Sequence, residues 1–132
     1  MIGLTDDSRE IALMTNNPLV KAAYGDEMPV EYTEETLPEL LVRVRNKVHT
    51  GCRLLSHPLS GSVKPNETIY KSVVISKASG EIDPQSVNII EGCIHTARKF
   101  PQLDIPESVL PELMEIDLSL IRPAVERAKQ LY

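Results

Sequence analysis

The residues best suited to chemistry lie together in the polar segment Ser56–Thr68. The segment carries hydroxyl side chains, one lysine, one asparagine and a glycine whose bare backbone lets a ligand approach closely. Two prolines restrict the backbone, so these hydrogen-bond donors would be partly preorganised. The combination suits an anion such as a carboxylate or a phosphate. Within the segment, the residues that we predict to bind a ligand are His57, Ser60, Gly61, Ser62, Lys64 and Asn66.

The same segment also has plainer explanations. Serine, glycine, proline and asparagine are turn residues, and a single lysine is usually solvated. The spacing GxxxxGK[ST] of a nucleotide-binding loop is absent, so no nucleoside triphosphate site is indicated. His57 can serve as a base, a donor, a metal ligand or a structural hydrogen-bond partner. No GxSxG surrounds the nearby serines, which disfavours nucleophilic catalysis. With scattered histidines and no CxxC, we expect neither a metal nor a cofactor.

Short β-rich runs alternate with helical patterns along the chain. Helices are predicted after the cap-and-proline pairs Asn17-Pro18 and Asp83-Pro84, and after the capping box Thr36–Glu39. Residues 108–132 have mostly helical spacing, although an alternation at 116–120 leaves a strand open there. We predict a single α/β domain over residues 1–132, with a loose N-terminus at 1–9 and a small, mainly parallel sheet flanked by helices. About four strands are expected, at Glu10–Thr15, Pro29–Thr33, Cys52–Leu55 and Ile69–Ser76.

The sheet would bring further polar residues to the long segment. If the first and third strands are parallel, Asn16 and Asn17 emerge at the same edge as His57, where open α/β sheets bind ligands. Helix capping is an equally good explanation of the two asparagines. Lys71, on the fourth strand, would add positive charge, and we include it in the predicted site. Asp117 is either a cap or the partner of a lysine.

Composition excludes several classes of function. The net charge of −5, with 19 acidic and 14 basic residues, lacks the basic footprint of a nucleic-acid-binding protein. Cys52 and Cys93 lie in apolar segments and are predicted to be buried thiols. Met1–Glu10 has no cationic, apolar leader, and no apolar run approaches the ~20 residues that span a bilayer. We therefore expect a cytoplasmic protein without membrane contact; the sequence does not set its oligomeric state.

Four stretches of the chain resemble the GrdX family. They are TNNPLV at Thr15–Val20, HPLSGSVKPNET at His57–Thr68, YKS at Tyr70–Ser72 and IDLSLI at Ile116–Ile121. The resemblance implies a small bacterial protein encoded beside the selenium-dependent glycine, sarcosine and betaine reductase systems of amino-acid-fermenting anaerobes. It implies no catalytic residues. The stretch Arg122–Tyr132 lies outside it.

Three functional hypotheses follow. The first is a non-catalytic accessory protein of anaerobic amino-acid reduction that binds a small anionic metabolite. The second, less favoured, is a small transferase or hydrolase with His57 as general acid or base and Lys64 stabilising negative charge. The third is a protein–protein adaptor that presents the long segment to a reductase component without any small ligand.

Overall fold

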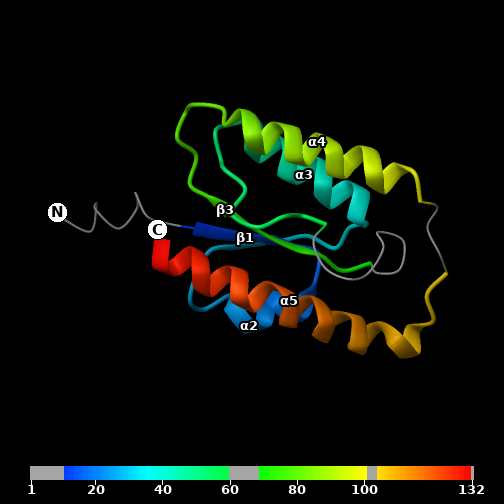
Figure 1. Cartoon of the computed structure of the whole chain (residues 1–132). Helices are drawn as coiled ribbons and strands as arrows, with labels where there is room; N and C mark the ends of the chain where they lie inside the picture. Colours follow the sequence, from blue (N-terminus) through cyan, green and yellow to red (C-terminus); the bar gives the residue numbers. More distant parts are fainter. Residues whose placement is uncertain (1–10, 60–68, 101–103, 132) are drawn as a thin grey trace.

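The computed structural model describes residues 11–59, 69–100 and 104–131 (Figure 1). The loose N-terminus predicted at residues 1–9 lies outside this part of the chain. So do the predicted ligand-binding residues Ser60, Gly61, Ser62, Lys64 and Asn66. The elements follow in the order β1 (Ile11–Thr15), α2 (Pro18–Tyr24), β2 (Val30–Tyr32), α3 (Leu37–His49), β3 (Ser72–Ser76), α4 (Pro84–Arg98), the 3-10 helix η1 (Glu107–Val109) and α5 (Leu110–Leu131).

The sheet has three strands in the described residues, in the order β2-β1-β3. β1 is parallel to β2 and antiparallel to β3, and Thr15 at the end of β1 pairs with both Tyr32 and Ser72. The α/β class is confirmed, whereas the prediction of about four mainly parallel strands is wrong. β3 follows the predicted third strand, Cys52–Leu55, in the chain and pairs antiparallel with it at Leu54, so β3 also runs antiparallel to β1.

The predicted third strand, Cys52–Leu55, forms only a single antiparallel bridge, between Leu54 and Ile75. Two backbone bonds flank the bridge, from Leu55 N to the carbonyl of residue 74 at 2.8 Å and from the amide of residue 76 to the carbonyl of residue 53 at 2.9 Å. Serine hydroxyls replace further ladder bonds: Leu54 N donates to Ser86 Oγ at 3.0 Å, and the amide of residue 74 donates to Ser56 Oγ at 2.9 Å. The segment therefore covers the outer edge of β3 without becoming a regular strand.

The direction of this segment nevertheless matches the expectation. It runs antiparallel to β3, and β3 runs antiparallel to β1, so the segment and β1 point the same way. Asn16, which follows β1, and His57, which follows the segment, consequently leave the sheet at the same edge. This is the edge at which the parallel pair β1 and β2 ends, and we call it the carboxyl edge.

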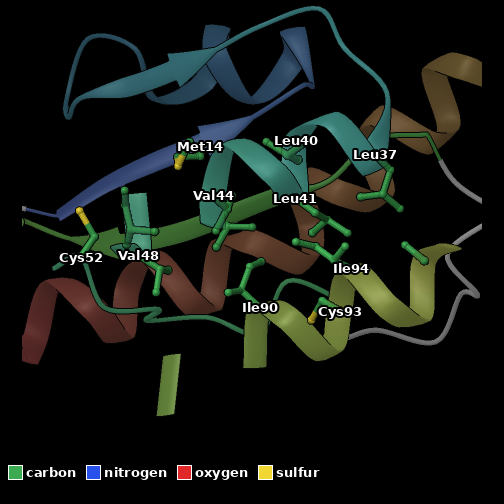
Figure 2. Close-up of a cluster of buried hydrophobic side chains, with 13 residues drawn as sticks. Met14, Leu37, Leu40, Leu41, Val44, Val48, Cys52, Ile90, Cys93 and Ile94 are labelled. Atoms are coloured by element: carbon green, nitrogen blue, oxygen red, sulfur yellow. The ribbon is translucent and has the colours of Figure 1, made fainter. Parts of the chain in front are cut away.

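Helices cover both faces of the sheet. In Figure 1, α3 and α4 lie over one face, and α2 and α5 lie over the other. Alternate residues of β1 serve the two cores, with Met14 on the α3/α4 side and Leu13 on the α2/α5 side. Figure 2 shows the first core, in which leucine, isoleucine and valine side chains pack together with Met14 and the two cysteines. Cys52 and Cys93 are free and buried, as predicted.

The helix starts predicted from the capping residues are confirmed for α2, α3 and α4. Asn17 caps α2 by accepting from Leu19 N at 2.9 Å, Thr36 and Glu39 form the capping box of α3, and Asp83 caps α4. The region 116–120 is helical. The alternation of apolar and polar residues at 116–120 does not produce a strand, because the buried residues of α5 recur at helical spacing from Asp117 to Ala128. None of the described helices is long and apolar enough to cross a membrane.

Candidate functional site

Two buried hydroxyl groups join the strands at the carboxyl edge. Thr15, the last residue of β1, lies opposite Ser72, the first residue of β3, and their hydroxyl oxygens are 2.7 Å apart. Thr15 Oγ1 also accepts from Asn17 N at 2.9 Å, which ties the end of the sheet to the start of α2. A hydroxyl group both donates and accepts, so this pair can relay a hydrogen-bonded chain toward a third group.

That third group is the carboxylate of Asp117 on α5. Its Oδ2 accepts from Ser72 Oγ at 2.7 Å and from Asn17 Nδ2 at 3.0 Å. The Asp117 residue is 4% exposed. Burial raises the pKa of Asp117 above its ordinary value, and the hydrogen bonds from Asn17 and Ser72 and the positive charge of Lys71 offset only part of that rise. Asp117 is therefore held in a dry position in which its carboxyl group takes up a proton more readily than an exposed aspartate does.

Lys71 lies beside this carboxyl group and is itself only 5% exposed. Its backbone is fixed by Asn16, whose Oδ1 accepts from Lys71 N at 2.8 Å, and by Thr15 Oγ1, which donates to the Lys71 carbonyl at 3.1 Å. Burial lowers the pKa of Lys71, while the negative charge of the Asp117 carboxylate acts in the opposite direction. Burial thus shifts the pKa of Lys71 and the pKa of Asp117 toward each other. The alternative that Asp117 is the partner of a lysine agrees with this arrangement.

Lys71 and Asp117 line a small hollow of about 30 Å³ between the start of β3 and α5, which we call the Lys71–Asp117 hollow. This volume admits a water-sized group. The other lining residues are the polar Ser56, His57 and Ser72 and the apolar Leu120, Ile121 and Ala124. His57 is exposed, so the hollow reaches the surface there. His57 Nδ1 accepts from Leu59 N at 3.1 Å, and the neutral ring therefore carries its proton on Nε2.

A second, wider hollow of about 340 Å³ lies against α4, and His57 lines it too. The thiol of Cys93 forms part of its wall. Burial raises the pKa of Cys93 to about 11, so the group is a thiol and not the thiolate that acts as a nucleophile. This wider hollow consequently offers space next to His57, but its cysteine is unsuited to covalent chemistry.

The predicted asparagines hold this site together. Asn16 Nδ2 donates to the carbonyl oxygens of Ile69 at 2.7 Å and Glu35 at 3.0 Å. Asn17 caps α2, and its Nδ2 bonds to Asp117 and to the Met114 carbonyl. The capping alternative for Asn17 is thus confirmed. Both side chains use their hydrogen-bonding groups within the protein and position the chain around Lys71 and Asp117; direct ligand contact by either remains a prediction.

The structure brings four predicted site residues to one edge: Asn16, Asn17, His57 and Lys71. Thr15, Ser56 and Ser72 were not selected from the sequence, and Asp117 was only an accessory candidate. A signal for them exists. Polar residues that end apolar strands, and a carboxylate on the buried face of an amphipathic helix, are out of place unless they are hydrogen-bonded to one another. Among the described residues, no three histidine, cysteine or acidic side chains are grouped as metal ligands.

Comparison with known families gives one match. A family model described as GrdX-like protein matches residues 12–126, which include every described residue of the Lys71–Asp117 hollow. No curated protein and no solved structure matches the chain.

Proposed function

We propose that this chain, which belongs to the GrdX-like family, is a cytoplasmic, non-catalytic accessory protein that binds a small anionic metabolite. The reaction that it serves would be anaerobic amino-acid reduction, with glycine or betaine as the reduced substrate. The family membership supports this setting through the resemblance described above. The ligand would be a compact carboxylate or phosphate that enters at the carboxyl edge.

The observation that carries the proposal is the burial of Lys71 at the wall of a hollow. A lysine that is 5% exposed has lost most of its hydration, and an ammonium group in a medium of low polarity attracts an anion more strongly than one in water. Asp117 competes with the anion for this charge. Because burial raises the pKa of Asp117, the carboxyl group can take up a proton and leave the charge of Lys71 to the ligand.

Two residues with hydrogen-bond donors line the same hollow. Ser56 Oγ accepts a hydrogen bond from the β3 backbone and can donate its own proton, and His57 carries a proton on Nε2. Both residues line the Lys71–Asp117 hollow. One cation and two neutral donors around an opening fit the oxygen atoms of a carboxylate or a phosphate.

Thermal melts of the purified full chain test the proposal. Acetate, glycine, sarcosine, betaine, inorganic phosphate and acetyl phosphate are compared as additives. A ligand at a hundredfold excess over its Kd stabilises the fold by about 2.7 kcal/mol, so we expect at least one anion to raise Tm. Lys71→Met should abolish the rise. Lys77→Met, at the exposed lysine that follows β3, is the control and should retain it.

A folded protein whose Tm responds to none of these compounds would contradict the proposal. An equal response in the wild type and in Lys71→Met would move the binding away from the hollow. Co-purification with a reductase component, in the absence of any anion response, would favour the adaptor hypothesis. The enzyme hypothesis has less support than either, because His57 is exposed and its Nδ1 is engaged by Leu59 N.

A further inference from the structure

A lysine amine and a carboxyl group share one nearly dry wall at the carboxyl edge. Lysine and aspartate side chains are rarely buried to this extent unless they are paired. Lys71 is 5% exposed and Asp117 is 4% exposed, and both line the Lys71–Asp117 hollow. The burial of Lys71 strengthens its attraction for an anion, but anion binding alone does not require a carboxyl group next to the amine. The burial of the amine beside a carboxyl group calls for a chemical explanation.

We propose that Lys71 forms a reversible covalent imine with the carbonyl group of a small oxo acid, and that Asp117 relays the protons of this step. The oxo acid is a carboxylate that also carries an aldehyde or ketone group. The inference rests on the proposed anion site and names the chemical class of its ligand.

The environment favours the reactive form of the amine. Only a neutral amine attacks a carbonyl carbon, and burial against Leu120, Ile121 and Ala124 disfavours the charged form. The pKa of Lys71 is lowered accordingly. Lysines that form imines in proteins are activated by the same desolvation. The hollow therefore provides an amine that is easier to deprotonate than an exposed lysine.

The carboxyl group is held in a fixed orientation at the wall of the hollow. Both side-chain hydrogen bonds to Asp117, from Ser72 and from Asn17, are made to Oδ2, and the Ser72 backbone amide also favours the carboxylate form. Because it lines the hollow, the carboxyl group can exchange a proton with a group that reacts there. Ser72 and Asn17 act through Asp117 and are positioning residues.

The step balances as follows. The carboxylate of Asp117 takes one proton from the Lys71 ammonium group, and the neutral amine forms a carbon–nitrogen bond to the carbonyl carbon. The carbonyl π electrons move to oxygen, which receives a proton from the new nitrogen and becomes a hydroxyl. Asp117 then returns its proton to that hydroxyl, the carbon–oxygen bond breaks, and water leaves. The nitrogen lone pair completes a protonated imine, and Asp117 is again a carboxylate.

The space limits the ligand to a short chain. About 30 Å³ admits a carbonyl group but no bulky substituent, and the remainder of the molecule must extend toward the surface. Ser56 and His57 lie on that route and can donate hydrogen bonds to the ligand carboxylate. The carbonyl and carboxylate groups of the ligand should therefore be separated by few atoms, as they are in glyoxylate.

Reductive trapping tests the inference on the full chain. Glyoxylate and sodium cyanoborohydride are added, and the modified lysines are located and quantified by peptide mass spectrometry. We expect Lys71 to be modified severalfold faster than Lys77 at neutral pH, because burial lowers the pKa of the Lys71 amine and so raises the fraction of it that is neutral. The rate at Lys71 should also reach half its maximum at a pH below the ordinary pKa of lysine.

Matched variants and ligands complete the design. Lys71→Arg should lose the adduct at this position, Asp117→Asn should slow its formation, and Lys77→Arg should leave the adduct at Lys71 unchanged. Glycolate, which has no carbonyl group, should give no adduct. Circular dichroism establishes that each variant is folded, and Asp117→Asn keeps the test valid if Lys71→Arg does not fold.

The outcomes separate the two proposals. Modification of Lys71 at no more than the rate of Lys77, in a folded protein that binds glycolate or acetate in a calorimeter, would overturn the imine and leave the anion site standing. Equal modification by acetaldehyde and glyoxylate would overturn the assignment to an oxo acid, because the carboxylate would then play no part. Neither adduct nor anion binding would overturn both.

Discussion

The hydrogen bond between Ser72 and Asp117 connects α5 to the start of β3. A double-mutant cycle measures the free energy that this hydrogen bond contributes to folding. The two atoms, Ser72 Oγ and Asp117 Oδ2, are 2.7 Å apart, and both residues are buried. Hydrogen bonds to charged groups contribute about 1.5–3 kcal/mol to stability, and the short distance with full burial favours the upper part of that range. We therefore expect a coupling free energy of about 2.5 kcal/mol between Ser72→Ala and Asp117→Ala.

The assay is urea denaturation followed by far-UV circular dichroism, since the chain has no tryptophan. Ser79→Ala is the matched control. Ser79 is exposed and bonds to the carbonyl of Gly51, far along the chain from α5, so its cycle with Asp117→Ala should give a coupling within about 0.5 kcal/mol of zero. A coupling that small for Ser72 and Asp117 would refute the arrangement of the site, because the carboxylate would then not be held by β3.

Four further predictions concern the same fold. Burial raises the pKa of Asp117 in the folded protein, so its stabilising contribution is complete below the unfolded pKa, near 3.8, and is lost as the pH rises through the folded pKa. The stability of Asp117→Asn relative to the wild type should therefore increase from pH 3.8 toward neutral, and parallel pH profiles in urea denaturation would contradict this. Asn16→Ala removes one buried and two partly buried hydrogen bonds and should destabilise the fold by about 2–4 kcal/mol in the same assay. Gly51→Ala should destabilise it by about 1–3 kcal/mol, because Gly51 has a φ of +102° and a Cβ would lie 2.7 Å from Gly80 N. In contrast, Gly92→Ala, where a Cβ meets nothing within 4 Å, should leave Tm unchanged or raise it, since alanine favours a helix interior by about 1 kcal/mol.

The helices could be predicted from sequence because their signals are local. A cap followed by proline at Asn17 and at Asp83, and the capping box at Thr36, each act within a few residues. In α3 and α4 the buried residues recur at helical spacing along one face of the helix, and this pattern can be read from the segment itself. Such signals can be recognised without knowing which other elements the helix packs against.

The sheet and half of the site depend on contacts between residues that are distant in sequence. They are therefore harder to predict from the sequence than the helices. The stretch Cys52–Leu55 has the composition of a strand. Hydroxyl groups of Ser56 and Ser86, however, accept hydrogen bonds from backbone amides that would otherwise bond to a neighbouring strand. Nothing in its own residues indicates that outcome. Asp117 acquires its role from Ser72 and Asn17, which are distant in sequence. The asparagines were assigned to the correct edge, yet their hydrogen bonds hold the chain around Lys71.

The central claim is that the Lys71–Asp117 hollow at the carboxyl edge receives a small anion, and an NMR titration locates the binding directly. Acetate and acetyl phosphate are titrated into ¹⁵N-labelled full chain, and amide shifts are followed residue by residue. The largest shifts should occur at His57, Lys71, Ser72 and Asp117, and Lys71→Met should remove them. Shifts concentrated at the opposite end of β1, around Ile11 and Ser76, or a spectrum that does not change, would contradict the claim.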